Sequence, residues 1–155
     1  MKRKAAPTES EILSEIRSIY QDLAERPIQR NCTLQTECCR FHLTGKTPLL
    51  TAGEAFVAAK AIRSAGRTSM PESPDGSCPM LDQRTARCMI YANRPFACRT
   101  HFCEGAGGPL ARKDVLDLIR RLEVVDASMN GKGAVNITSA VREQLHSLSG
   151  RTHRR

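Results

Sequence analysis

Aromatic residues are scarce in this chain of 155 residues, which contains no tryptophan, two tyrosines and four phenylalanines. Proteins that bind single strands of nucleic acid without sequence preference stack successive bases on aromatic side chains. The few aromatic residues here are scattered along the chain. The sequence therefore argues against a base-stacking platform.

Long hydrophobic runs are also missing. No apolar stretch approaches the roughly 20 residues that a membrane-spanning helix needs. The N-terminus starts with basic residues but lacks the apolar region of about 7–15 residues that defines a secretory signal peptide. Pro7 and several polar or acidic residues follow instead. We therefore expect a protein of the reducing cytoplasm that makes no membrane contact.

Acidic residues are absent from both ends of the chain, although the net charge of +8 arises from 24 basic and 16 acidic residues. Six of the basic residues stand at the ends: Lys2, Arg3, Lys4, Arg151, Arg154 and Arg155. The composition predicts a basic disordered tail at residues 1–8, one domain at residues 9–149, and a second basic tail at residues 150–155. Because the body is nearly neutral, any nucleic-acid binding should be weak, salt-sensitive and confined to the tails.

Two capping boxes predict the first two helices, at Thr8–Glu11 and at Thr51–Glu54. Apolar residues follow each box at helical spacing. Pro27 ends the first helix, and Gly66 is a suitable residue to end the second. The apolar residues expected on the inner face of the first helix are Ile12, Ile16, Ile19, Tyr20 and Leu23.

The rest of the chain predicts two further helices around an irregular middle. A helix is expected over residues 113–129. After a short extended piece, Thr138 or Ser139 is expected to cap a last helix that runs through Leu148. Residues 67–79 contain three prolines and a glycine and should form a loop. We predict a small, mainly α domain whose cysteine-rich loops are organised around a metal centre.

Seven cysteines are the unusual feature of the composition. An odd number cannot pair fully within one chain, and thiols stay reduced in the cytoplasm, so clustered cysteines indicate metal or redox chemistry rather than disulfides. Thiolates are soft ligands that suit zinc, Cu(I) and iron–sulfur clusters. All seven are candidate metal ligands, in two clusters: Cys32, Cys38 and Cys39, then Cys78, Cys88, Cys98 and Cys103.

The identity of the metal is less clearly indicated. Zinc sites commonly contain cysteine pairs separated by two to four residues, and only Cys98 and Cys103 fit that spacing. The wide loops and the adjacent pair Cys38–Cys39 suit a multinuclear centre, so the pattern favours an iron–sulfur cluster slightly over zinc. His42 and His101 lie inside the clusters and are further candidate ligands.

The cysteine segments resemble the YkgJ-like cysteine-cluster family, whose CxxCxxCC domain is described as zinc- or iron-chelating. The segment "CTLQTECC" is similar to the first family motif, and "CPMLDQRTARCMIYANRPFACRTHFC" is similar to the second. One position departs from the pattern, because the second cysteine of the first motif falls on Gln35. The resemblance implies metal chelation and names no reaction. Gln35, His42, His101 or water could fill the missing ligand position.

Three functions remain open from the sequence. The first is a binding or accessory module with a thiolate-rich iron–sulfur or zinc centre, whose partners are the metal and a possible second protein. The second is a redox or electron-transfer protein, or a subunit of an iron–sulfur enzyme. The third is a zinc-stabilised adaptor for nucleic acid or protein. No catalytic residue is predicted, and the sequence favours a role without catalysis.

Overall fold

Four long helices account for most of the regular structure. A computed structural model describes residues 5–152 of the chain. Its long helices are α1 (Glu9–Ala24), α3 (Ala52–Ser64), α5 (Leu116–Ser128) and α6 (Ile137–Thr152). The chain forms a small, mainly α domain, as the sequence predicts. Half of the residues of the predicted basic tails, 1–4 and 153–155, lie outside the described residues.

The remaining elements are short. Two short helices are α2 (Phe41–Thr44) and α4 (Phe96–Thr100). The 3₁₀ turns are η1 (Glu37–Cys39), η2 (Tyr91–Asn93), η3 (Glu104–Ala106) and η4 (Arg112–Asp114). Two antiparallel strand pairs join β1 (Leu49–Leu50) to β4 (Val135–Asn136) and β2 (Leu81–Asp82) to β3 (Arg87–Cys88). The short extended piece expected before the last helix is β4.

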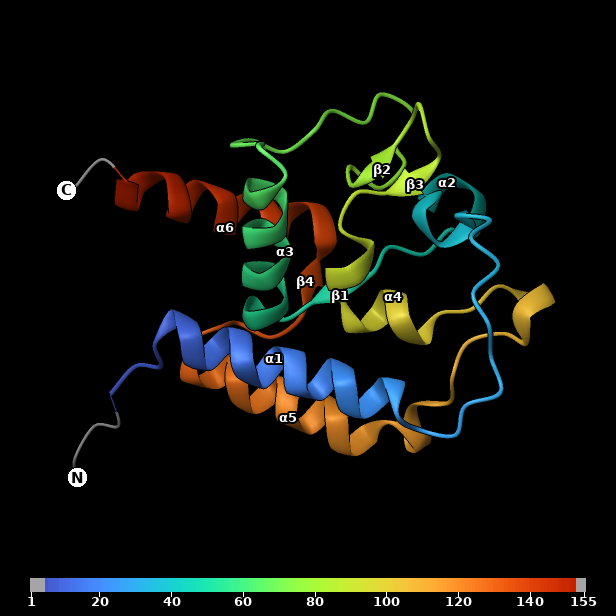
Figure 1. The fold of residues 1–155 in the computed structure, drawn as a ribbon, viewed down its shortest axis with the longest axis horizontal. Helices are drawn as coiled ribbons and strands as arrows, with labels where there is room; N and C mark the ends of the chain where they lie inside the picture. Colours follow the sequence, from blue (N-terminus) through green and yellow to red (C-terminus); the bar gives the residue numbers. More distant parts are fainter. Residues whose placement is uncertain (1–4, 153–155) are drawn as a thin grey trace.

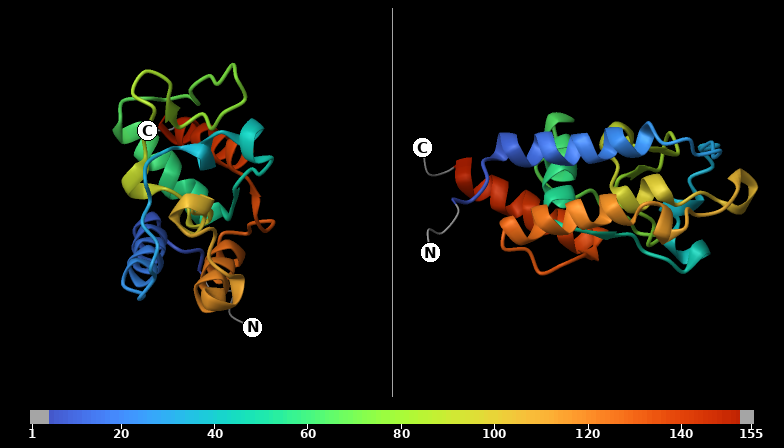
Figure 2. Two further views of the ribbon diagram at one scale, coloured as in Figure 1. Left: turned by 90° about the vertical axis from the view of Figure 1, so that its right-hand side faces the viewer. Right: turned by 90° about the horizontal axis from the view of Figure 1, so that it is seen from below.

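The helices form a bundle with the cysteine segments at one end. Helices α1 and α5 run antiparallel and side by side, and α3 crosses between this pair and α6 (Figures 1 and 2). Elements α2, α4, β2 and β3 gather at the end of the bundle away from the start of α1 and the end of α6 (Figure 1). Within residues 5–152, none of the helices combines the length and the hydrophobicity required to cross a lipid bilayer.

Both predicted capping boxes are confirmed. In α1 the Thr8 N–H donates to Glu11 Oε2 at 2.7 Å, and the Glu11 N–H donates to Thr8 Oγ1 at 3.2 Å. In α3 the Thr51 N–H donates to Glu54 Oε2 at 3.0 Å. The five apolar residues predicted for the inner face of α1 are all buried in the core: Ile12, Ile16, Ile19, Tyr20 and Leu23.

The bounds of the last two helices differ from the predictions. Residues 112–114 form the 3₁₀ turn η4, so α5 begins at Leu116 rather than at residue 113. Helix α6 begins at Ile137 and runs to Thr152, past the predicted end at Leu148. Its cap is Asn136, whose side-chain oxygen accepts the Ser139 N–H at 3.0 Å, rather than Thr138 or Ser139.

The irregular middle is anchored to the helical core by its own apolar residues. Residues 67–79 contain no helix or strand, as predicted. Five residues from the end of this loop onward belong to the buried core cluster of the bundle: Cys78, Met80, Leu81, Ile90 and Phe96. The cysteine segments therefore share a core with the long helices.

Candidate metal centre

Six of the seven cysteines line a single cavity of about 300 Å³ at the end of the bundle. The two cysteine clusters of the sequence come together here. The six are Cys32, Cys38, Cys39, Cys78, Cys88 and Cys98. Apolar residues fill most of the remaining wall, including Met80, Ile90, Pro95, Phe102 and Ile137, and no carboxylate residue lines the cavity.

Backbone hydrogen bonds join the two clusters. The Cys78 N–H donates to the Cys39 carbonyl at 2.6 Å. Strands β2 and β3 pair so that Cys88 lies opposite Leu81. The 3₁₀ turn η1 contains both Cys38 and Cys39. Residues that are about forty positions apart in sequence therefore present their thiols to one space.

Helix α4 positions Cys98 through a contact with the bundle. Pro95 is the N-cap residue of α4, and the N–H of Phe96, the first residue of this helix, donates to Glu54 Oε1 at 2.7 Å. Glu54 is only 2% exposed and is also the carboxylate of the α3 capping box. One buried carboxylate thus accepts bonds at the starts of two helices and fixes α4 relative to α3.

The surroundings of Glu54 are buried and charged. Burial raises the pKa of Glu54, although hydrogen bonds from Thr51 and Phe96 oppose the shift. Burial and the nearby Glu54 carboxyl raise the pKa of Tyr20 well above its usual value, and the Tyr20 hydroxyl makes no hydrogen bond of standard geometry. The Arg99 guanidinium stacks 4.1 Å from the centre of the Tyr20 ring.

Two of the arginines beside the thiols have different roles. Arg99 donates from Nε to the Arg94 carbonyl at 2.7 Å and from Nη2 to the Ala92 carbonyl at 2.8 Å, so it stabilises the turn before α4. Arg94 lines the cavity and stacks 4.0 Å from the Tyr91 ring centre. Its Nε atom is buried and has no hydrogen-bond partner among the described residues.

The cavity raises the pKa of several thiols. A hydrogen bond to Cys39, together with burial, raises the pKa of Cys38. A hydrogen bond from Cys38 lowers the pKa of Cys39, but its bond to Cys78, burial and neighbouring thiols outweigh this and raise it to about 12. Burial is the main cause of the raised pKa values of Cys88 and Cys98. These thiols are protonated at neutral pH, so metal binding must release protons.

Cys103 is not among the residues that line the six-cysteine cavity. It lines a small hollow of about 20 Å³, shared with Cys32, Cys38, Gln35 and His101. The Cys103 sulfur lies 3.8 Å from Thr33 Oγ1. Gln35 is exposed and lines this hollow, but it is not among the residues that line the six-cysteine cavity.

The two candidate histidines are placed differently. His42 is exposed and lies in none of the hollows next to the thiols. His101 is half-buried and lines the six-cysteine cavity. Only one of the two histidines inside the clusters therefore faces the thiols.

The donor set fits a thiophilic metal by its chemistry. All seven cysteines are free thiols, and soft sulfur donors with imidazole select zinc, copper and iron–sulfur centres. In the part of the chain that the structure describes, no three Cys, His, Asp or Glu side chains are close enough to hold one metal ion as they stand. Metal binding therefore requires the thiols around the cavity to turn toward a common point.

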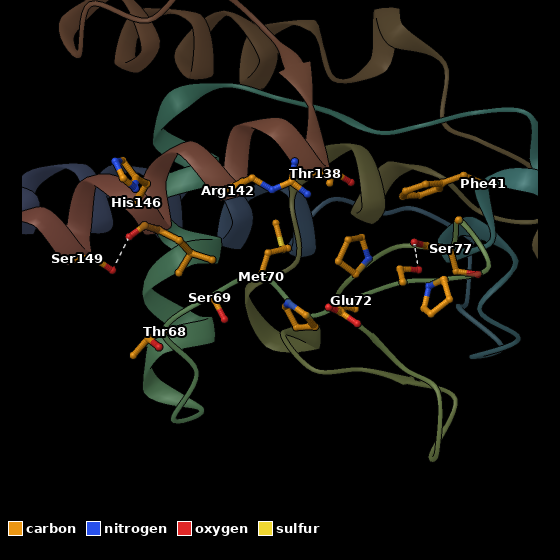
Figure 3. A pocket seen from close by; sticks show the side chains of 16 residues that line it. Phe41, Thr68, Ser69, Met70, Glu72, Ser77, Thr138, Arg142, His146 and Ser149 are labelled. Carbon is orange, nitrogen blue, oxygen red and sulfur yellow. Dashed lines mark hydrogen bonds between the residues drawn. The ribbon is translucent and has the colours of Figure 1, made fainter.

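A larger groove of about 820 Å³ lies between the proline-rich segment and α6 (Figure 3). Arg142 and His146 project from α6 near one wall, and Met70 and Glu72 come from the segment 67–79 (Figure 3). No cysteine lines this groove. It contributes no ligand to the candidate centre, although it reaches the residues on either side of Cys78.

Sequence reasoning missed the second role of Glu54. The capping box predicts its bond to Thr51, but the partner Phe96 lies 42 residues away and leaves no local signal. The sequence sign is a glutamate in a helix, "AGEAFVAAKAI", whose other residues are small or apolar apart from Lys60.

Comparison with known proteins gives one match. Residues 29–115, more than half of the chain, match the model of the CxxCxxCC family, described as "Putative zinc- or iron-chelating domain". The matched range includes all seven cysteines. The chain has no match among curated proteins or among solved structures.

Proposed function

We propose a specific role for this chain, which belongs to the family of zinc- or iron-chelating CxxCxxCC domains. The protein is a binding or accessory module that holds a thiolate-bound polynuclear centre in the six-cysteine cavity. An iron–sulfur cluster fits this cavity better than a single zinc ion. The candidate ligands are the six of the seven predicted cysteines that line this cavity, so Cys103 is the one left out.

The number of thiols around one cavity carries the proposal. A structural zinc ion takes four protein ligands, whereas six cysteines line this space. Its volume of about 300 Å³ is far above the roughly 10–15 Å³ that a single water molecule requires. A centre of several metal atoms with bridging sulfide would use this space, and four cysteines are enough to bind it.

Arg94 supports an anionic centre in this place. Its buried Nε–H lacks an acceptor among the described residues, and an unsatisfied buried donor is costly. Thiolates and bridging sulfides carry negative charge and accept hydrogen bonds, which tune such clusters. The guanidinium also lowers the pKa values of Cys38 and Cys88, although burial and other contacts outweigh it.

The lining of the cavity favours binding over catalysis. No carboxylate lines it, so the usual acid–base pair of a hydrolytic site is missing from this wall. An electron-transfer role is the second candidate, because Leu34 and Tyr91, which line the cavity, are 57% and 42% exposed. A centre close to the surface can exchange electrons with a partner. The alternative of a zinc-stabilised adaptor stays a prediction, as does the cytoplasmic location.

Anaerobic purification followed by metal and acid-labile sulfide analysis tests the proposal. We expect a brown protein with iron and sulfide in comparable amounts and thiolate-to-iron absorption bands. A colourless protein with stoichiometric zinc and no sulfide would contradict the iron–sulfur cluster and support a zinc site in its place. A protein that binds neither metal would overturn the proposal entirely.

Two serine variants provide a matched comparison. Cys98 lines the six-cysteine cavity, whereas Cys103 lies outside it. Cys98→Ser should therefore lose most of the bound metal, and Cys103→Ser should keep most of it. Equal loss in both variants would contradict the assignment of the centre to the six-cysteine cavity. Circular dichroism should show the same helical content for both proteins.

A further inference from the structure

We propose that His101 is a direct ligand of the metal centre and occupies the coordination position that has no cysteine because of Gln35. The inference rests on the proposed function, since it needs a metal in the cysteine cavity. It adds a residue outside the seven thiols to the site. It also predicts a mixed sulfur and nitrogen ligand set.

His101 lies where three hollows meet. It lines the six-cysteine cavity of about 300 Å³, the small hollow beside Cys103, and a third hollow of about 290 Å³ that Lys46 and Leu49 also line. Cys38 lines the same three spaces, and Cys98 lines two of them. The imidazole is therefore a neighbour of the thiols from both clusters.

The local backbone keeps His101 next to Cys98. His101 is the C-cap of α4, and its N–H donates to the Ala97 carbonyl at 3.1 Å. Residues three apart on a helical turn lie on the same side, so Cys98 and His101 share a face. Such spacing lets one short helix present two ligands to one metal.

The imidazole of His101 is free to bind. It is half-buried, and neither ring nitrogen makes a hydrogen bond or an ion pair with the described residues. Neutral imidazole is a common ligand of zinc and iron. In a cluster with only cysteine ligands, a histidine in place of a thiolate raises the reduction potential.

The other two candidates for the eighth position are less well placed. His42 is exposed and lines none of these hollows. Gln35 is exposed, and it stands between Leu34 and Thr36, whose φ angles are +60° and +58°. These two residues adopt a left-handed conformation that non-glycine residues rarely take. The amide oxygen is also a harder donor than imidazole for a thiophilic metal.

X-ray absorption spectroscopy of the metal-loaded protein tests the inference directly. For zinc, nitrogen ligands scatter at about 2.0–2.1 Å and sulfur ligands at about 2.3 Å. We expect the wild type to show a nitrogen shell that disappears in His101→Ala and is replaced by sulfur in His101→Cys. His42→Ala is the matched control and should keep the nitrogen shell.

Metal retention gives a second readout. Loss of a neighbour that only orients a ligand typically costs about 10–100-fold in metal affinity, so His101→Ala should release metal to a chelator at least about tenfold faster. Gln35→Cys should release it at the wild-type rate. His101→Cys keeps a metal donor at this position and should retain metal better than His101→Ala. Such retention would show that misfolding is not the cause of the faster release in His101→Ala.

The outcomes separate the two proposals. A wild type without metal would overturn the proposed function. A metal-loaded wild type with sulfur ligands alone, or a nitrogen shell that persists in His101→Ala, would overturn only the role of His101. Additional sulfur scattering and slower metal release in Gln35→Cys would also overturn it, because residue 35 would then be at the centre.

Discussion

At the scale of single residues, one buried carboxylate links the helical core to the metal site. Glu54 accepts hydrogen bonds from Thr51 in its own helix and from Phe96 at the start of α4. Glu11 occupies the same position in the capping box of α1, where it is exposed and bonds to Thr8. The two residues share a local motif, and Glu54 also joins α3 to α4.

Glu54→Gln should destabilise the protein much more than Glu11→Gln. A glutamine offers one acceptor oxygen where the carboxylate offers two, so a buried donor loses its partner at a cost of about 1–3 kcal/mol. Urea unfolding of both variants measures the difference. Glu54→Gln should also release metal faster, because α4 carries Cys98. Equal losses in the two variants would mean that Glu54 serves only as a cap.

Arg94→Lys should weaken metal binding although it preserves the charge. Lysine has no planar group to stack on Tyr91 and no Nε–H at the buried position. Because outer partners of metal ligands typically contribute about 10–100-fold to affinity, chelator-driven metal loss should accelerate within this range. Arg87→Lys is the control, since Arg87 lines the same cavity but is exposed. Unchanged metal retention in Arg94→Lys would show that the Arg94 guanidinium does not contribute to metal binding.

At the scale of elements, the starts of α3 and α4 each bond to a carboxylate from a neighbouring helix. Asp126 of α5 accepts the Ala52 N–H at the start of α3 at 2.8 Å and the Gly133 N–H at 2.9 Å. Glu54 of α3 then accepts the first N–H of α4. Negative charge at a helix N-terminus is favourable. These contacts therefore connect α5 to α3, and α3 to α4, the helix that carries Cys98.

Gly131→Ala tests the contact between Asp126 of α5 and the start of α3. A Cβ atom at residue 131 would lie 2.2 Å from Asp126 Oδ1, so the carboxylate would have to move away from Ala52 and Gly133. We expect a loss of about 1–3 kcal/mol in the free energy of unfolding, the cost of leaving buried donors unpaired.

Gly150→Ala is the matched control for this change. Gly150 lies in α6 with open space around its Cβ position, so alanine there should be neutral or stabilise by up to about 1 kcal/mol through helix propensity. Urea unfolding of both variants measures the difference in their free energies of unfolding. Similar stability of the two alanine variants would contradict the role given to Asp126.

At the scale of the whole molecule, the bundle and the metal end differ in what stabilises them. Helices α1 and α5 are joined by the ion pairs of Arg121 with Glu15 and Asp22 and of Arg26 with Asp117. These pairs are partly exposed, and each contributes only about 0–1 kcal/mol. Most of the stability of the bundle therefore comes from its buried apolar residues, whereas the metal end depends also on what the thiols bind.

Metal removal should loosen the cysteine end and leave most of the bundle folded. We expect most of the far-ultraviolet circular dichroism to remain, because the four long helices share an apolar core. Amide hydrogen exchange should accelerate in residues 78–103 and much less in α1 and α5. Collapse of helical signal throughout the molecule on chelation would show that the bundle needs the metal as well.

The metal-free protein should lose stability in alkaline solution. The pKa of Cys39 is raised to about 12 in the folded protein, above the value of about 8.5 for an unfolded cysteine. The folded state then binds more protons than the unfolded state, so this stabilisation is complete below pH of about 8.5 and is lost as the pH rises toward 12. Thermal melting of metal-free protein between pH 8 and 11 measures the loss.

Two comparisons check the origin of this pH dependence. Cys39→Ser should show a shallower decline of melting temperature with pH, because it removes one of the shifted thiols. The metal-loaded protein should decline less steeply than the metal-free protein, because bound thiolates are already deprotonated. Identical profiles of melting temperature against pH for wild type and Cys39→Ser would contradict the assignment of this pH dependence to Cys39.

The sequence alone determined the helices that have strong local signals. Both capping boxes and the inner face of α1 are readable because the pattern involves residues three or four positions apart. The bounds of helices were less predictable where a weaker local signal decided them, as at Asn136, which caps α6 two residues before Thr138, the first predicted cap. The cysteine motifs also identified the family, because their spacing is a property of the sequence itself.

Only the tertiary structure decided which residues face one another at the candidate centre. Cys103 and Gln35 belong to the same motifs as the other cysteines, yet they lie beside a separate small hollow, and His101 rather than His42 faces the thiols. Spacing along the chain cannot show this, because the wide loops between the motifs allow many arrangements. The packing of α4 on Glu54 and the Cys39–Cys78 backbone bond select one of them, and both contacts join residues about forty positions apart.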